Sequence, residues 1–389
     1  FGSPSDKLKM IGVTGTKGKT STTYMIKSIA EAFSKKVGLI GTIVDMIGER
    51  EIYTEKTTPE SLDLQRLLRQ MLDEGVEWVV MEVSSHSLEL KRVAGITYDV
   101  GIYTNLAHEH LDFHGDMVNY RAAKRKLFDA AKLAIINADD AAGSFMAQGV
   151  SCPVVFYGIN NHDGYYAADI KNTPQGVSYR MVFPGGTLDI SVGIPGIFMV
   201  YNSLAACAAM HAIGVPGECI ARGIAGLKGI PGRFEVIAGG GRGYTVIRDY
   251  AHTPDSLEQT IKTAKAFAGG RVVTLFGCGG DRDRAKRPMM GEIAGRLSDF
   301  VIITSDNPRT EEPGSIIAMI EEGIKRTSCP YICIENRKEA MLYSLKNAMP
   351  KDLILFAGKG HETYQEIHGI RYPFDEKGVT AELLKQLNK

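Results

Sequence analysis

The sequence predicts an α/β protein with two domains, each built on a mainly parallel sheet with helices on both faces. Over its 389 residues, apolar runs bounded by glycine alternate with amphipathic segments. Between residues 154 and 192 the pattern changes to short alternating segments with Pro-Gly and Gly-Gly turns, which predicts a small antiparallel addition. The alternation restarts after GIPGR at 229–233, so we expect domains at 1–231 and 232–389.

The first domain is predicted to hold buried strands at 8–13, 37–42, 78–83, 98–104 and 133–137. Helices are expected at 19–33, 59–74, 117–131, 202–213 and 217–227. Thr58 is a candidate N-cap, and Pro59 suits the first helical position.

The second domain is predicted to hold strands at 244–250, 271–276, 300–304 and 352–357, with helices beginning at Pro254 and near Ala285. This restart of βα alternation indicates a Rossmann-like domain. The run GGGRG at 239–243 predicts a hairpin turn before the first of these strands, and we assign it no chemistry.

The composition excludes some classes of protein. Lys plus Arg and Asp plus Glu both total 45, so the net charge is zero, which argues against a nucleic-acid or membrane-surface binder. No apolar run is long enough to span a bilayer. The six cysteines form no CxxC pair, which favours reduced thiols in a cytoplasmic protein and no zinc site.

A glycine-rich loop joins the first predicted strand to the first predicted helix. Gly18, Lys19 and Thr20 match the end of a phosphate-binding loop, but Val13 stands where the first glycine is usual, and the nearest upstream glycine is Gly15. Backbone N–H groups and a helix N-terminus would attract phosphate there, with the lysine on the terminal phosphates and the threonine hydroxyl on Mg²⁺. The alternative is a tight turn with an exposed lysine, which the Gly-Lys-Thr triplet disfavours. A dinucleotide fold would require GxGxxG and an acid after the next strand, and neither is present.

The loop TGTKGKT resembles the shortened loop TGTNGKT of the Mur ligases and folylpolyglutamate synthetases, with Lys17 in place of the usual Asn. Matching motifs follow in order: TTP from Thr57, MEVSSH from Met81, TNL from Thr104, HLDFHG from His110, YRAAK from Tyr120, NADD from Asn137, GRFE from Gly232, DYAHTP from Asp249, FGCGGDRD from Phe276, SDNPRTEEP from Ser305 and AGKGHE from Ala357. The set covers almost the whole chain and most resembles the MurE branch, the UDP-N-acetylmuramoyl-tripeptide synthetases. The motifs from Ser305 and Ala357 weigh against a folylpolyglutamate synthetase.

The resemblance implies an ADP-forming ligase of peptidoglycan precursor synthesis, which uses ATP and Mg²⁺ to convert a carboxylate into an acyl phosphate that an amine then attacks. It implies catalytic roles for Lys19, Glu82, His110 and Lys124, and metal binding by Thr20, Glu82, His110 and Lys124, with Lys124 carbamylated. Without the family resemblance, the residues themselves give weaker evidence for these catalytic and metal-binding roles. Glu82 near a strand end fits a Mg²⁺ ligand or a solvated carboxylate, a lone loop histidine is often structural, and YRAAKRK reads as a solvated basic helix face.

The resemblance also implies the binding residues. Nucleotide contacts are expected from Gly15, Thr16, Lys17, Gly18, Lys19, Thr20, Ser21, Asn105 and Asn202, and from Arg233, Asp249 and His252, which would close the site from the C-terminal domain. The muramoyl-peptide is expected at Thr57, Thr58, Ser84 and Arg92, and the amino acid at Arg287, Asp306, Asn307, Arg309, Gly358 and Glu362. The guanidinium of Arg309 suits the second carboxylate of meso-diaminopimelate, which favours that amino acid over L-lysine.

Two departures from the family pattern leave alternatives open. Met199 stands where an Asn is usual, so nucleotide contacts near it are in doubt. The chain begins shortly before the phosphate loop, so we expect the family's N-terminal UDP-binding domain to be cleaved, omitted or naturally absent. The alternatives are a Mur-like ligase acting on another carboxylate without UDP recognition, and a non-catalytic ATP-binding module. We expect a monomer whose partners are the UDP-muramoyl-dipeptide and a diamino acid.

Overall fold

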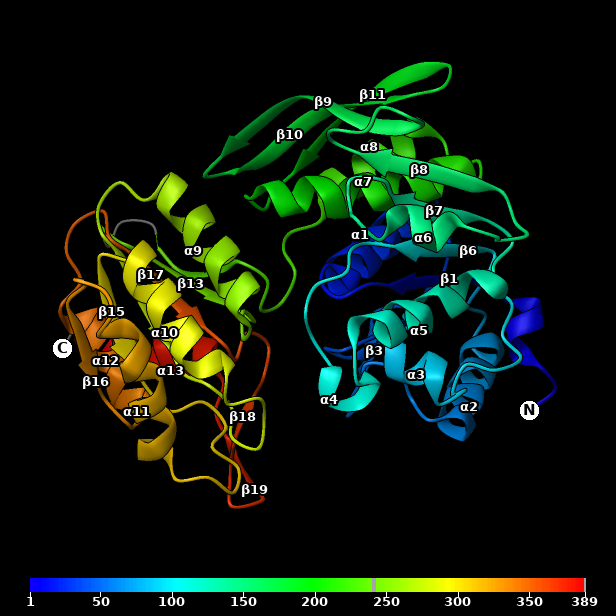
Figure 1. Cartoon of the computed structure of the whole chain (residues 1–389). Coiled ribbons are helices and arrows are strands. Elements are labelled where there is room, and N and C mark those ends of the chain that lie inside the picture. The colour runs from blue at the N-terminus through cyan, green and yellow to red at the C-terminus, as the bar shows by residue number, and fades with distance from the viewer. Residues whose placement is uncertain (240–242, 388–389) are drawn as a thin grey trace. The chain divides into compact units, whose positions relative to one another are not determined.

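The structure, a computed structural model, describes residues 1–239 and 243–387. They form two compact units, Phe1–Lys228 and Gly229–Lys389 (Figure 1). The sequence places the boundary between residues 231 and 232, within the same GIPGR segment. Residues 240–242 of the predicted turn at 239–243 lie outside the described part of the chain.

Unit 1 is built on one eleven-stranded sheet. In spatial order its strands are β11 (Gly186–Val192), β10 (Gly176–Phe183), β9 (Tyr165–Thr173), β8 (Val154–Gly158), β7 (Ala134–Asn137), β6 (Val100–Tyr103), β1 (Lys9–Thr14), β5 (Trp78–Glu82), β2 (Val37–Ile40), β3 (Asp45–Ile47) and β4 (Arg50–Ile52). The strands from β9 through β2 are joined by parallel pairs, and β9 to β11 form an antiparallel ribbon. The predicted antiparallel addition therefore extends the central sheet.

Helices cover both faces of this sheet, which confirms the predicted fold class (Figure 1). One face carries α1 (Lys19–Ala32), α7 (Ile197–Ala212) and α8 (Gly217–Gly226), which pack on one another. The other carries α2 (Ser61–Asp73), α3 (Ser85–Glu89), α4 (Leu111–His114), α5 (Met117–Asp129) and α6 (Gly143–Ala147), and a 3₁₀ turn, η1 (Pro4–Lys7), precedes β1. On that face Leu64 and Met71 of α2 and Leu127 of α5 join the buried core beneath β1 and β5.

Two predicted helix starts are wrong. α2 begins at Ser61 rather than at Pro59, because the Thr58 hydroxyl donates to the Glu82 carbonyl (2.8 Å) and accepts from the Ser84 amide (3.1 Å) instead of capping the helix. α7 begins at Ile197 rather than near Asn202. Its first turn, residues 197–200, is wholly apolar, and such a segment lacks the polar face by which periodicity reveals a helix.

Unit 2 holds a six-stranded sheet in the order β12 (Glu235–Ala238), β13 (Thr245–Asp249), β17 (Leu353–Ala357), β14 (Val272–Phe276), β15 (Phe300–Ile303) and β16 (Tyr331–Cys333). All pairs are parallel except β12 with β13. The helices are α9 (Pro254–Phe267), α10 (Lys286–Leu297), α11 (Pro313–Ile324), α12 (Arg337–Lys346) and α13 (Glu376–Leu387). A separate hairpin pairs β18 (Tyr364–Ile367) with β19 (Ile370–Pro373). β17 lies between β13 and β14, although it is the last strand of the sheet along the chain.

A buried ion pair anchors β17 to the helices of unit 2. Arg337 donates to Glu376 (2.9 Å) and to the carbonyls of Ser305 (3.3 Å) and Ala357 (2.9 Å), and the Arg337 and Glu376 side chains are both 0% exposed. Removing one partner of such a pair leaves an uncompensated charge in the interior.

Arg337→Met is therefore expected to lower the free energy of unfolding of unit 2 by about 3–5 kcal/mol. Hydrogen exchange of peptides from β17 measures the change, while fluorescence of Trp78, the single tryptophan, reports on unit 1 and should not move. The double variant Arg337→Met/Glu376→Met should recover most of the loss. An Arg337→Met protein with unchanged protection of β17 would contradict the prediction.

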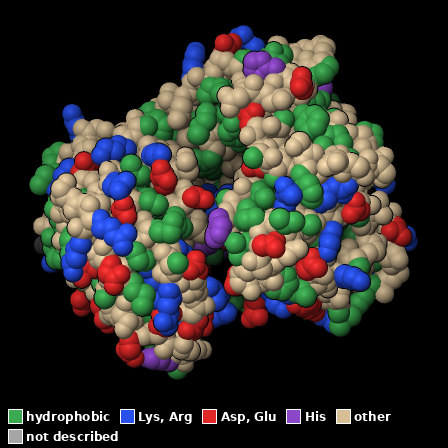
Figure 2. Space-filling view, in the orientation of Figure 1, with side chains coloured by type: hydrophobic (Ala, Val, Ile, Leu, Met, Phe, Trp, Pro, Cys, Tyr) green, Lys and Arg blue, Asp and Glu red, His purple; other side chains and the backbone are tan. Residues whose placement is uncertain are grey.

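Charges of both signs are intermixed over the visible face of each unit (Figure 2). All six cysteines are free. In the described part of the chain, no helix combines the length and the apolar character needed to cross a membrane.

Candidate active site

The glycine-rich loop lies at the carboxyl end of β1, where the chain changes direction along the sheet. From β1 the chain builds β2 and then β5 on one side, and it next continues with β6 and β7 on the other. Crevices at such switch points are the usual ligand sites of parallel sheets. The structure therefore places residues 14–21 at the expected position for a nucleotide.

Hydrogen bonds from the end of β6 hold the loop backbone. The Asn105 amide accepts from Lys17 N (2.9 Å) and donates to Lys17 O (3.0 Å), the Thr104 hydroxyl donates to the same carbonyl (2.6 Å), and Thr16 N donates to Asn105 O (2.8 Å). Asn105, predicted to contact the nucleotide, thus uses both ends of its amide on the loop. Gly18 precedes α1 with φ +87°, a left-handed conformation that favours glycine.

Gly15 is a second position where only glycine fits. Its φ is +146°, and an added Cβ would overlap the Thr104 hydroxyl and crowd the amide of Asn105. Gly15→Ala should therefore raise the Kd for ATP by about tenfold or more, since the loop must shift to relieve the overlap. Isothermal titration with a non-hydrolysable ATP analogue measures this change. Gly75→Ala, a left-handed glycine with open space around its Cα, controls for backbone strain away from the loop. Equal affinities for the Gly15→Ala and wild-type proteins would contradict the prediction.

Two lysines meet at the Gly15 carbonyl. Lys19 Nζ donates to Gly15 O (2.9 Å) and Thr16 O (3.0 Å), and Lys124 Nζ of α5 donates to the same Gly15 oxygen (2.8 Å). Lys124 is 1% exposed, so the predicted solvated helix face is wrong for this residue. Burial, and next the charge of Lys19, hold the pKa of the Lys124 amine well below its usual value. The Tyr120 ring lies 4.4 Å from the Lys124 nitrogen, and its hydroxyl hydrogen-bonds Thr16 (3.1 Å).

His110 lies in a cluster of aromatic side chains beside these lysines. It is left-handed (φ +59°), and its ring packs edge-to-face on His86 (4.9 Å between ring centroids) and on Tyr120 (6.0 Å). Although 44% of the His110 side chain is exposed, desolvation by its neighbours lowers its pKa to about 4, against the attraction of Glu109, so the ring is neutral at pH 7. Glu109 also forms an ion pair with Lys17 (3.1 Å), the residue that replaces the usual Asn of the loop.

Glu82 is fixed at the carboxyl end of β5, beside Val13 on β1. It is 1% exposed, and Thr42 donates to both of its carboxylate oxygens, from its amide and from its hydroxyl (3.0 Å each). Gly41 makes room for this arrangement, since a Cβ there would lie 2.7 Å from Glu82 Oε1. Glu82 is therefore a rigid buried carboxylate rather than a solvated strand end.

The four residues predicted to hold the muramoyl-peptide lie around the end of β5. The Thr57 hydroxyl contacts that of Thr42 (3.0 Å), and Thr58 is buried beneath Ser84, the N-cap of α3. Arg92 pairs with Glu60 (3.0 Å) and donates to Thr58 O (3.5 Å). The structure thus brings all four together.

The departure at Met199 falls in the protein core. Met199 is 0% exposed in the first turn of α7, and its carbonyl accepts from Ser203 (2.7 Å). Asn202, by contrast, lies next to the loop. Its amide oxygen is so near Gly18 that a Cβ added there would overlap it, and its carbonyl accepts from the Thr22 hydroxyl (3.5 Å). The Met199 side chain is therefore part of the buried core of unit 1.

In unit 2, Arg233, Asp249 and His252 gather around Tyr250. Asp249 ends β13 and accepts from Phe234 N (2.7 Å), and burial raises the pKa of its carboxyl. The Arg233 guanidinium lies 4.8 Å from the Tyr250 ring centroid, and the His252 ring lies 4.6 Å from it. Their assignment to the nucleotide remains a prediction.

The predicted amino-acid pocket follows the carboxyl ends of β15 and β17. Asn307 donates to Glu362 (2.8 Å), and Gly358, with φ +111°, leaves room for Asp306 Oδ2, which would lie 2.7 Å from an added Cβ. Arg309 donates to Gly280 O (2.7 Å) and lies 3.7 Å from the carboxylate of Glu366. Burial raises the pKa of Asp306, but the charges of Lys359 and Arg337 outweigh it and hold that pKa below its usual value.

Arg287 is bound differently from the other predicted pocket residues. It is 0% exposed, and its guanidinium donates twice to Glu311 (2.7 and 2.9 Å). These bonds lower the pKa of Glu311 to about 2. Of the Arg287 guanidinium nitrogens, Nε is buried and has no hydrogen-bond partner in the described part of the chain.

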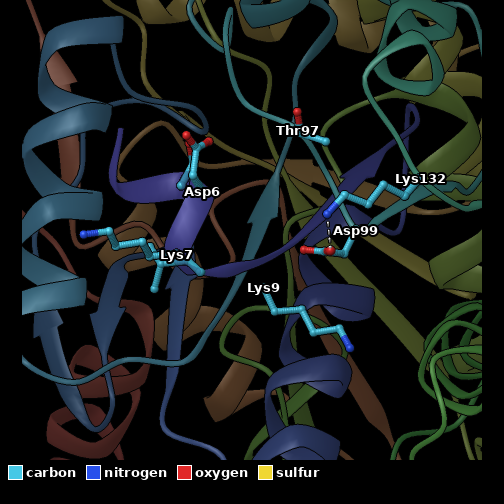
Figure 3. Close-up of a pocket in the computed structure, with 8 residues that line it drawn as sticks. Asp6, Lys7, Lys9, Thr97, Asp99 and Lys132 are labelled. Atoms are coloured by element: carbon cyan, nitrogen blue, oxygen red, sulfur yellow. Dashed lines mark hydrogen bonds and ion pairs between the residues drawn. The ribbon is translucent and has the colours of Figure 1, made fainter. Parts of the chain in front are cut away.

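A pocket of about 520 Å³ lies at the amino end of β1, at the opposite edge of the sheet from the loop (Figure 3). Lys132 points toward Asp99 and pairs with it (2.9 Å), whereas Lys7 and Lys9 point in different directions. Lys9 lies 4.7 Å from the Trp78 ring centroid. Because the ammonium groups do not converge, we assign this pocket no chemistry.

Sequence reasoning missed Thr42, His86, Tyr120, Tyr250 and Lys359. Tyr120, His86, Tyr250 and Lys359 stand inside the quoted motifs, which is the signal that would have singled them out. Thr42 carries no such signal, because its partner Glu82 is 40 positions away.

Comparisons with known proteins fit this architecture. Residues 13–210 match the Mur ligase middle domain, and residues 232–360 match the Mur ligase, glutamate ligase domain. The chain is 49% identical, over 100% of its length and 80% of the relative's, to UDP-N-acetylmuramoyl-L-alanyl-D-glutamate--2,6-diaminopimelate ligase of Caldanaerobacter subterraneus subsp. tengcongensis. It is 50% identical, over 99% of its length and 79% of the relative's, to the protein of the same name from Alkaliphilus metalliredigens.

A solved structure described as UDP-N-acetylmuramoyl-L-alanyl-D-glutamate--2,6-diaminopimelate ligase superposes with a TM-score of 0.71 at 34% identity, covering 98% of this chain and 79% of that one. Family models match both units, and relatives are about 50% identical to this sequence over the whole chain; together these matches establish the family. The chain belongs to the Mur ligase family.

Proposed function

We propose that this protein is an ATP-dependent ligase that joins meso-diaminopimelate to the D-glutamate carboxylate of UDP-N-acetylmuramoyl-L-alanyl-D-glutamate. The observation that carries the proposal is the convergence of Lys19 and Lys124 on the Gly15 carbonyl of a phosphate loop. The names of the relatives supply the substrates. Because the reaction consumes ATP, we propose that it takes place in the cytoplasm. The substrates assign it to peptidoglycan precursor synthesis.

The chemistry requires two anions to approach each other. The substrate carboxylate attacks the γ-phosphorus of ATP, ADP leaves, and an acyl phosphate forms. The amine of the diamino acid then attacks the acyl carbon, inorganic phosphate leaves, and the amine proton passes to solvent or to a nearby base. The loop amides and Lys19 would hold the phosphates, and Lys19 would leave its two carbonyl partners for the γ-phosphate.

The residues present fit a magnesium ion. Magnesium prefers oxygen ligands from one or two carboxylates together with phosphate and water. Thr20 Oγ1, the fixed carboxylate of Glu82 and a carbamate on Lys124 would supply oxygens, with the neutral ring of His110 beside them. In the described residues, no group of three or more His, Cys, Asp or Glu side chains could hold a metal by itself, so the lysine modification is part of this proposal. When bound, the ion would neutralise charge on the transferring phosphoryl group.

The surroundings of Lys124 support its carbamylation. An amine attacks CO₂ only in its unprotonated form, forming an N–C bond and releasing one proton. Lys124 is buried, and its amine nitrogen donates a hydrogen bond to Gly15 O. The resulting anion would lie next to the ammonium of Lys19, which would stabilise it.

Selection of the diamino acid would rest on the pocket of unit 2. Arg309 is fixed by Gly280 O, and its guanidinium suits the second carboxylate of meso-diaminopimelate. Glu362 suits an ammonium group of the same molecule. Asp306 and Asn307 would complete the pocket.

The test measures phosphate release from ATP and Mg²⁺ with UDP-N-acetylmuramoyl-L-alanyl-D-glutamate and, in parallel, meso-diaminopimelate, L-lysine or no amino acid. Release that depends on meso-diaminopimelate, with the tripeptide product seen by mass spectrometry, is the expected result. A protein that binds ATP but forms no product with either amino acid would overturn the proposal.

A further inference from the structure

Lys359 is a fully buried lysine that binds two residues of the predicted amino-acid pocket, and no prediction from the sequence gave it a role. It follows β17 between two left-handed glycines, Gly358 and Gly360, and is 0% exposed. Its ammonium donates to Asn307 Oδ1 (3.0 Å) and to Glu362 Oε2 (3.0 Å). A lysine is rarely buried completely unless its charge is paired.

These bonds fix the orientation of Asn307. An ammonium can only donate, so the oxygen of the Asn307 amide must face Lys359. That oxygen also accepts from Glu366 N (3.0 Å), and the amide nitrogen consequently faces Glu362 Oε2 (2.8 Å).

The same bonds engage one oxygen of the Glu362 carboxylate. Oε2 accepts from both Lys359 and Asn307, so both of these hydrogen bonds of the carboxylate fall on one of its oxygens. Lys359 therefore fixes one oxygen of Glu362 and offsets the charge of its carboxylate. Close by, Arg309 faces Glu366 (3.7 Å).

The charge balance of this group matters for the choice of substrate. meso-Diaminopimelate carries two ammonium and two carboxylate groups and is neutral overall, whereas L-lysine lacks one carboxylate and is a cation. A pocket whose acids are already paired with Lys359 and Arg309 suits the neutral molecule. Loss of the Lys359 charge would make the pocket more negative by one unit and would favour the cation.

We propose that Lys359 is a positioning and specificity-determining residue, which orients Asn307 and Glu362 and sets the pocket charge that favours meso-diaminopimelate over L-lysine. This inference rests on the proposed function. Lys359 acts through Asn307 and Glu362, and it need not touch the substrate.

The experiment is a competition with both amino acids in one tube, in which the two tripeptide products are measured by mass spectrometry. The product ratio does not depend on how much of each preparation is folded. The variants are Lys359→Met and Lys359→Gln, which lose the charge, and Lys359→Arg, which keeps it. Lys346→Met, on the exposed side of α12, is the matched control for loss of one positive charge from unit 2.

Both neutral variants are expected to shift the ratio toward the L-lysine product by about tenfold or more, the scale of a charge-assisted hydrogen bond. Their KM for meso-diaminopimelate should rise while their KM for ATP stays unchanged. Lys359→Arg and Lys346→Met should keep the wild-type ratio. An unchanged ratio in the neutral variants would overturn the inference, and so would loss of both products in both of them. Failure of the wild-type protein to form either product would instead overturn the proposed function.

Discussion

Replacing Lys124 with alanine is expected to lower kcat/KM by about a thousandfold or more, because the proposed carbamate and its metal contact are lost together. Phosphate release under the conditions of the functional test measures the loss. Added acetate or another short carboxylate should restore part of the activity, since a small anion can enter the space that the side chain leaves. Lys126→Ala is the matched control, because Lys126 lies on the same helix, is exposed and pairs with Glu89 at the surface.

The carbamate itself can be observed apart from turnover. NMR of the protein in isotopically labelled bicarbonate should show one carbamate signal that Lys124→Ala removes and Lys126→Ala keeps. Full activity of the Lys124→Ala protein would refute the proposed role of this residue, whatever the spectrum shows.

Glu82→Gln is expected to reduce kcat/KM by a similar factor, about a thousandfold, and to raise the Mg²⁺ concentration needed for half-maximal activity. The substitution keeps the size of the side chain. The amide oxygen can still accept from Thr42 N, and its NH₂ can donate to the Thr42 hydroxyl, so the local fold should persist while the charge is lost.

The control for Glu82→Gln is Glu77→Gln, immediately before the other end of β5. Glu77 is exposed and pairs with Lys35. A magnesium titration of phosphate release compares the two variants with the wild-type protein. If Glu82→Gln retained the wild-type magnesium dependence, Glu82 would be a structural carboxylate and not a ligand.

The sequence sufficed where the signal was local. The phosphate loop, the helix after it and the buried strands of both units follow from glycine positions and apolar periods within a few residues of one another. Predicted ends of most elements lie within a few residues of the observed ones, because the same local residues form and end each element.

The rest depended on contacts between distant segments. Nothing near Thr58 shows that β5 will bind its hydroxyl, and nothing in YRAAKRK shows that Lys124 will be buried against a loop 109 positions earlier. Likewise, nothing in the sequence near Arg287 shows that its guanidinium forms an ion pair with Glu311. Lys359 stands inside a quoted motif, but its contact with Asn307, 52 positions away, cannot be read from the sequence.

The position of β17 has a consequence for how the protein is made. Leu353–Ala357 pairs with β13 on one side and with β14 on the other, yet the ribosome releases it after every other strand of that sheet. Until it arrives, β13 and β14 have no strand between them, and their facing edges expose unpaired amides and carbonyls. Unit 2 must therefore complete its fold late and around long-range pairings, which fold slowly, whereas the loop and sheet of unit 1 can form while synthesis continues.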